Sequence, residues 1–388
     1  MKRTDRRSSD SSGALSRRRL LGASIVAAAT VGAEGTGAQD AFAAEHGSGQ
    51  TAAAHESLSA APRDRTVLCL LGTAGGPPPV TTRTGTAAAL SVRGRVYVVD
   101  CGRSAVTQYG RAGLKFGDLA GVFITHLHID HIADYPNFVL LAAHGRNDVG
   151  DAAPTPFPAY GPGSAGALPV GRGDGAPPVD PADPVPGLRE LTRDSLNASA
   201  YSSNIFSRES GASDPRTRVQ VHEITVPDVA ADPLGDRAPD MEPFPVMDDG
   251  TVRVSAVLVP HGLVYPSFAY RFDTPDGSVV FSGDTAPSNN LVRLARGADI
   301  LVHEAIDLDF YRHSSGYSQA LLDHFAAAHT DVSLLGQIAE RCGVSMLVLT
   351  HLVPADTYLV PNASWRRRAA KGFSGRVVVG NDLDRIPL

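Results

Sequence analysis

The sequence has little cysteine and few aromatic residues. Its 388 residues include three cysteines, one tryptophan and 6% aromatic side chains. The cysteines are Cys69, Cys101 and Cys342, and no pair of them has the C-x-x-C spacing of a redox or zinc motif. So sparse a set argues against a disulfide framework, and a chain of this length can bury a large core without one. We expect three unpaired thiols in the core.

The N-terminus reads as an export signal. Arg17, Arg18 and Arg19 precede an apolar run that continues to about Ala33, and "AFA" follows at residues 41–43. A charged segment, a short apolar segment and small residues at a cleavage site are typical of a secretory signal, and paired arginines are typical of the bacterial twin-arginine type. We predict a twin-arginine signal peptide over residues 1–43, a disordered linker over 44–64 and a periplasmic or extracellular protein.

Long apolar runs and excess positive charge are absent from the rest of the chain. No later segment is long and apolar enough to span a membrane. Removal of residues 1–43 leaves 28 Lys and Arg against 37 Asp and Glu, a net charge of −9. Binding to nucleic acid relies on Lys and Arg contacts to phosphate, so this balance argues against a nucleic-acid partner.

The order of apolar runs predicts an α/β fold over residues 65–388. Short apolar runs come first and in the middle, and helical patterns lie between and after them. Such an order predicts two packed β-sheets with helices outside, a four-layer αββα sandwich. A Pro- and Gly-rich insert, about residues 150–185, is expected to form an irregular loop.

The stretch "THLHIDHIAD", residues 125–134, has the composition of a metal site. His126 and His128 follow the apolar run "GVFIT", and residues two apart on an extended segment point the same way. They can therefore bind one ion together. Asp130 and His131 lie where the chain turns toward a helix, and they can reach a second ion. Imidazole and carboxylate ligands suit Zn²⁺ and related ions.

Four further polar residues each follow a buried apolar run. They are His261 in "VLVPHG", Asp284 in "VVFSGDT", His303 in "ILVHEA" and His351 in "MLVLTH". Loops at strand ends are where active-site groups gather over a rigid sheet. The chain therefore holds enough candidate ligands for two ions.

The motif "THLHIDHIAD" resembles the signature of the metallo-β-lactamase fold superfamily, and the resemblance extends from about Thr66 to Leu388. The order of the candidate ligands resembles the ribonuclease Z-like branch. The stretches "LGTAGGPPPVTTRTG", "YRFDTPDGSVVFSGDT" and "VVVGNDL" look like exported zinc-dependent arylsulfatases of that branch.

This resemblance implies a particular division of ligands between two zinc ions. It implies that His126, His128 and His261 bind one zinc. It implies that Asp130, His131 and His351 bind the other, with Asp284 bridging both. Asp130 would also take part in catalysis. His303 would be the proton donor, tuned by Glu304, and His329 would contact substrate or begin the following helix.

The expected activity is hydrolysis of a small-molecule ester by metal-bound hydroxide, most of all an aryl or alkyl sulfate ester. A phosphodiesterase or lactonase is the alternative, and a metal-binding protein without catalysis is an alternative of another class. No Cys or Ser has the C/S-x-P-x-R context of formylglycine sulfatases, so that mechanism is excluded. Ribonuclease Z enzymes hold tRNA with an arm inserted between the positions of His261 and Asp284. Only a hairpin fits there, and the acidic charge and the export signal point the same way, so we expect no RNA substrate. A homodimer is a separate expectation.

Overall fold

The computed structural model describes residues 65–170 and 177–388. The predicted signal peptide, residues 1–43, and the predicted linker, residues 44–64, lie outside the described residues. The described residues belong to one compact unit. Among the described helices, none has the length and apolar character of a membrane span.

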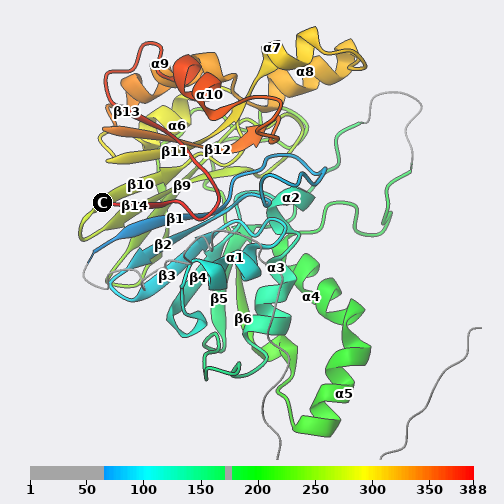
Figure 1. The fold of residues 1–388 in the computed structure, drawn as a ribbon. Helices are drawn as coiled ribbons and strands as arrows, with labels where there is room; N and C mark the ends of the chain where they lie inside the picture. Colours follow the sequence, from blue (N-terminus) through cyan, green and yellow to red (C-terminus); the bar gives the residue numbers. More distant parts are fainter. Residues whose placement is uncertain (1–64, 171–176) are drawn as a thin grey trace, which may run out of the picture. The chain divides into compact units, whose positions relative to one another are not determined.

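Two seven-stranded sheets form the centre of the fold (Figure 1). The first contains, in spatial order, β14 (Arg385–Pro387), β1 (Val67–Gly72), β2 (Ala87–Val92), β3 (Arg95–Val99), β4 (Leu119–Phe123), β5 (Phe157–Pro162) and β6 (Val219–Ile224). The second contains β13 (Arg376–Val379), β12 (Met346–Val353), β11 (Ile300–Ile306), β10 (Gly277–Phe281), β9 (Phe268–Thr274), β8 (Arg253–Leu258) and β7 (Phe244–Asp248).

Helices cover the outer faces of both sheets. The described helices are α1 (Ala105–Arg111), α2 (Ile129–Ile132), α3 (Tyr135–Asn137), α4 (Leu188–Ala198), α5 (Ala200–Ser210), α6 (Asn289–Leu294), α7 (Leu308–His313), α8 (Gln319–Ala328), α9 (Val332–Cys342) and α10 (Asn362–Ala369). Short helical turns also occur at Phe116–Asp118, Phe138–Ala142 and Pro215–Thr217. Helices α1 and α4 contact the first sheet, and α6, α9 and α10 contact the second (Figure 1). The predicted four-layer sandwich is confirmed.

Strand alternation explains why both faces of the first sheet are apolar. Leu68 and Leu70 of β1 face the core between the sheets, whereas Val67 and Cys69 face the helices outside. Successive side chains of a strand point to opposite faces, so a strand covered on both sides needs a continuous apolar run. Cys69, Cys101 and Cys342 are buried and unpaired, as expected from their sparse spacing.

The predicted irregular insert contains a strand. Phe157–Pro162 forms β5, which pairs in parallel with β4 on one side and β6 on the other. Its prolines made the segment look like a loop, because proline cannot donate a backbone hydrogen bond. Phe157 and Ala159 are nevertheless fully buried. Burial between two partner strands decides the conformation here, and local sequence does not show those partners.

Parallel pairing brings the candidate ligands to one edge of the sandwich. Strands β3, β4 and β5 run parallel in the first sheet, and β10, β11 and β12 run parallel in the second. The carboxyl ends of parallel strands lie at the same edge, where loops carry functional groups. His126 follows β4, Asp284 follows β10 and His351 lies near the end of β12.

Candidate metal centre

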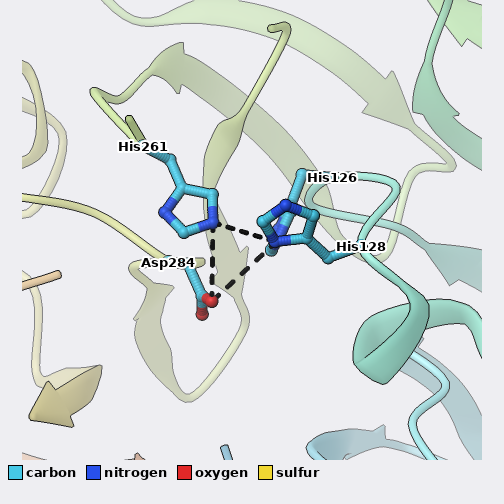
Figure 2. A group of neighbouring side chains, drawn as sticks. All are labelled: His126, His128, His261 and Asp284. Atoms are coloured by element: carbon cyan, nitrogen blue, oxygen red, sulfur yellow. Dashed lines mark hydrogen bonds and ion pairs between the residues drawn. The ribbon is translucent and has the colours of Figure 1, made fainter. Parts of the chain in front are cut away.

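Seven side chains converge at this edge in two groups. The first group is His126, His128, His261 and Asp284, whose nearest donor atoms all lie within 4.8 Å of one another (Figure 2). The second group is Asp130, His131 and His351, with the same closeness. The structure thus brings together every residue predicted to bind metal.

One carboxylate oxygen lies between the two groups. Asp284 Oδ2 is 3.9 Å from His126 Nε2 and 3.8 Å from His261 Nε2 of the first group (Figure 2). The same oxygen is 3.3 Å from His131 Nε2 and 3.2 Å from His351 Nε2 of the second group. One oxygen of Asp284 therefore lies within 3.9 Å of imidazole nitrogens of both groups.

Glycine and backbone strain allow this close approach. A Cβ at Gly283 would lie 2.5 Å from the carbonyl oxygen of Phe268, so only glycine lets β10 end beside β9. A Cβ at Gly75 would lie 2.4 Å from His351 Nδ1, which shows how closely the loop after β1 covers that imidazole. His351 has a φ of 43°, a conformation that non-glycine residues rarely adopt and that often marks functional sites.

Hydrogen bonds orient the imidazoles from behind. His261 Nδ1 donates to the carbonyl oxygen of Ala328 at 2.7 Å, which leaves Nε2 as the lone-pair nitrogen toward Asp284. His131 Nδ1 lies 2.8 Å from Asp100 Oδ2 and donates to it, which turns His131 Nε2 toward the centre. A partner behind a histidine sets both its tautomer and its orientation, as in many metal sites.

Asp100 is a contributor that the sequence interpretation missed. It follows β3 directly, and its carboxylate also accepts the backbone N–H of Thr125 at 2.8 Å. Its φ of 59° again places strain beside the site. A polar residue after a buried strand is the signal that found His261 and Asp284, and it could have found Asp100.

Burial and charge set the protonation of the cluster. Burial lowers the pKa of His126 and His128, and it lowers that of His261 to about 3. Burial also opposes the charge on His131, but the carboxylates of Asp284 and Asp100 outweigh it and raise the pKa of His131. Burial likewise opposes ionisation of Asp284, yet His351 and His131 hold its pKa well below the usual range.

The proton-donor candidates do not lie as expected. The Glu304 carboxylate is 3.4 Å from His329 Nδ1 and accepts the backbone N–H of Thr330 at 2.9 Å. His303 is fully buried, and its Nδ1 donates to the Glu304 carbonyl oxygen at 2.7 Å. Neighbours on a strand point to opposite faces, so the His303 side chain points away from the Glu304 carboxylate.

His329 lies at the centre itself. Its Nδ1 is 3.9 Å from Asp284 Oδ2, and it forms a third close group with Asp284 and His351. Burial opposes protonation, but the Glu304 carboxylate outweighs it and raises the pKa of His329 to about 9. Asp134, the last residue of the motif, accepts the backbone N–H of Val106 at 2.7 Å and so supports the start of α1.

Comparison with known proteins places the chain in a family. Residues 67–143, which include the histidine motif, match the profile of the family described as "Anti-Pycsar protein Apyc1". Ribonuclease Z of Mycobacterium bovis (strain BCG / Pasteur 1173P2) is 33% identical over 323 residues, which cover 82% of this chain and 97% of the relative. The chain belongs to the ribonuclease Z family. The same protein of Mycobacterium avium (strain 104) is 32% identical over 317 residues and 96% of its length.

Solved structures agree on the fold. The short form of human tRNase Z has a TM-score of 0.54 and 22% identity, covering 82% of this chain and 98% of that one. The metallo-β-lactamase fold protein YhfI from Bacillus subtilis has a TM-score of 0.52 and 17% identity, covering 84% and 100%. The predicted metallo-β-lactamase fold and ribonuclease Z-like branch are confirmed.

Family membership corrects three expectations. The main expected activity, sulfate-ester hydrolysis by an arylsulfatase-like enzyme, is wrong, because relatives matched over nearly their whole length are named ribonuclease Z. The expected small-molecule substrate with no nucleic-acid partner is wrong for the same reason. The expectation of an exported arylsulfatase-like protein is corrected with them, because the matched relatives are named ribonuclease Z. The residues that carried it, 1–43, lie outside the described residues.

The errors have physical causes. A metal-activated water attacks sulfur and phosphorus alike, so the ligand motif does not distinguish their esters. Net charge is a sum over the whole chain, whereas a phosphate group is bound locally, and metal ions supply positive charge that the sum omits. The missing arm between His261 and Asp284 removes one way of holding RNA, but not the chemistry that cleaves it.

Proposed function

We propose that this chain is a metal-dependent phosphodiesterase that cleaves RNA, with two divalent ions, Zn²⁺ by preference, held by the two groups. The observation that carries the proposal is the position of Asp284 Oδ2 between them, within 3.9 Å of imidazole nitrogens on both sides. Family membership supports the choice of RNA. The first ion would be held by His126, His128 and His261, and the second by Asp130, His131 and His351, with Asp284 shared.

The donor atoms fit metal ions in spacing and in chemistry. Ligand atoms about 2.0–2.1 Å from one tetrahedral zinc lie roughly 3.3 Å from one another. His261 Nε2 and His128 Nδ1 are 3.1 Å apart, and His351 Nε2 and Asp130 Oδ2 are 3.2 Å apart. His126 Nε2, His131 Nε2 and Asp284 Oδ1 are buried with no hydrogen-bond partner. Polar atoms buried without a partner are costly, and a bound ion would satisfy them.

When bound, the two ions supply activation of water at neutral pH and neutralisation of phosphate charge. The protein's own residues would hold the proton donor in place and protonate the leaving oxygen. Glu304 is held by the backbone N–H groups of Thr285 and Thr330, and its carboxylate lies 3.4 Å from His329 Nδ1. The same nitrogen is 3.9 Å from Asp284 Oδ2, so a proton on it would lie at the metal centre. We propose His329 as the proton donor to the leaving oxygen, in place of His303.

Hydrolysis assays with metal control test this function. Zinc-loaded protein should cleave a precursor tRNA and bis(p-nitrophenyl) phosphate, and p-nitrophenyl sulfate should react far more slowly. A chelator should abolish both phosphodiester activities, and added Zn²⁺ should restore them. Turnover that persists without metal, or hydrolysis of neither phosphodiester by the zinc-loaded protein, would overturn the proposal.

Replacing Asp100 with asparagine should weaken metal binding without removing a ligand. The change removes the negative charge behind His131 Nδ1, which lies 2.8 Å from the carboxylate. Loss of such a supporting partner lowers metal affinity by about 10–100-fold. Asp134→Asn is the matched control, because Asp134 also accepts a backbone N–H but supports α1. Competition with a chelator measures both affinities, and equal values for the two variants would contradict the role of Asp100.

A further inference from the structure

A second cavity opens beside the metal centre. It has a volume of about 180 Å³, and His128 lies in its wall. The rest of the wall comes from the loops after β5, before α4 and after His261, together with Pro233. His128 also belongs to the first group of candidate ligands, since its Nδ1 is 3.1 Å from His261 Nε2. The cavity is therefore directly adjacent to that group.

The wall is apolar and unusually rich in proline. Five prolines line it, namely Pro162, Pro169, Pro186, Pro233 and Pro266. Proline has no backbone N–H and a fixed φ, so these walls offer few donors and little freedom. Of the described side chains that line the cavity, those of His128 and Tyr265 carry polar atoms, and the others are aliphatic or proline. A charged group would therefore lose its water here without gaining a partner.

The size of the cavity suits one ring. A cavity of roughly 150 Å³ lined by aliphatic and aromatic side chains binds benzene. At about 180 Å³, this cavity holds a single aromatic ring system rather than a longer polar chain. Flat rings pack well against Tyr265 and proline faces, and rigid walls reduce the entropy lost on binding.

We infer that this cavity, the ring pocket, binds the nucleobase next to the cleaved phosphodiester bond. The inference rests on the proposed function, since a phosphate seated at the metal centre would bring its neighbouring nucleoside to His128. Binding relies on stacking and apolar contact. Because the described lining offers few side-chain donors and acceptors for base edges, the pocket accepts different bases with similar affinity.

Binding of two probes that differ only in the base tests the ring pocket. Calorimetry with zinc-loaded protein should show that uridine 5′-monophosphate binds at least about tenfold more tightly than ribose 5-phosphate. The 5′-monophosphates of the four bases should agree within about threefold, since no base edge is read. Equal affinity for the first two probes, no binding of either, or strong preference for one base would overturn the inference.

Variants of Leu263 test whether the base of uridine 5′-monophosphate binds in the ring pocket. Its side chain lines the pocket yet is 55% exposed, so truncation removes a wall without unfolding the core. Leu263→Ala should reduce the advantage of uridine 5′-monophosphate to about threefold or less, and Leu263→Met should retain it. Leu334→Ala on α9 is the matched control, as Leu334 is 40% exposed and lies outside the pocket. An unchanged ratio in Leu263→Ala would place the base elsewhere.

An experiment with a modified RNA substrate tests the ring pocket independently of the proposed catalytic function. An abasic nucleotide on the pocket side of the cleaved bond should raise KM by about tenfold and leave kcat unchanged. Unchanged KM for abasic nucleotides on either side would overturn the inference even if RNA is cleaved. If the protein cleaves no phosphodiester, the calorimetric comparison still decides whether a base binds, so failure of the two proposals is distinguishable.

Discussion

Replacing Asp284 with alanine should remove both metal ions and nearly all activity. Asp284 Oδ2 is within 3.9 Å of imidazole nitrogens in both groups, so its loss affects both sites at once. Its loss also leaves five closely spaced imidazoles with less negative charge to balance bound cations. We expect metal content to fall from the proposed two ions per chain to well below one. Phosphodiesterase activity, as kcat/KM, should fall by at least about a thousandfold.

Metal analysis by mass spectrometry and kinetics on bis(p-nitrophenyl) phosphate check this result together. Asp194→Ala is a matched control, because Asp194 is 60% exposed on α4 and pairs only with its neighbour Arg193 among the described ion pairs. A folded Asp284→Ala protein that keeps both ions would contradict the shared position of Asp284. Circular dichroism establishes that the variant is folded.

Replacing His329 with alanine should reduce the rate according to the leaving group. An alkoxide leaving from RNA needs a proton, so RNA cleavage should fall by about 10²–10⁴-fold in kcat. Nitrophenolate is a stable anion that needs little protonation, so hydrolysis of bis(p-nitrophenyl) phosphate should change by less than about fivefold. Glu304→Gln keeps the acceptor for the Thr330 N–H but removes the charge beside His329, and it should reproduce the same selectivity in weaker form.

The metal content of His329→Ala distinguishes a proton-donor role of His329 from a role as metal ligand. His329 also forms a close group with Asp284 and His351, so it has the position of a possible ligand. As a proton donor, its loss leaves two ions bound, whereas loss of an ion would make it a ligand. His313→Ala serves as control, because His313 is exposed and its Nδ1 donates to the carbonyl oxygen of Asp309. Equal losses on both substrates would contradict the proton-donor role.

The correct expectations came from patterns that depend on few contacts. The H-x-H-x-D-H motif and the polar residues after buried strands marked all seven residues of the two groups. The apolar runs marked the sandwich, although they missed β5. These patterns work because the alternation of side chains along a strand follows from local sequence, and parallel strands bring their carboxyl ends to one edge.

The position of Glu304 shows what such patterns leave open. The family resemblance implied that Glu304 tunes His303, its neighbour in sequence. On a strand, adjacent side chains point to opposite faces, and Glu304 instead contacts His329, which is 25 positions further along the chain. Asp100 was missed for a related reason, since only the fold brings it to His131.

The sequence by itself determined the fold class, the metal-type chemistry and which residues gather at the strand ends, because these depend on residue type and strand periodicity. The tertiary structure decided the rest. It placed one oxygen of Asp284 between the two groups, turned Glu304 toward His329, and enclosed a proline-lined ring pocket beside His128. Each of these depends on contacts between segments that are far apart in the chain, and residue spacing alone does not specify them.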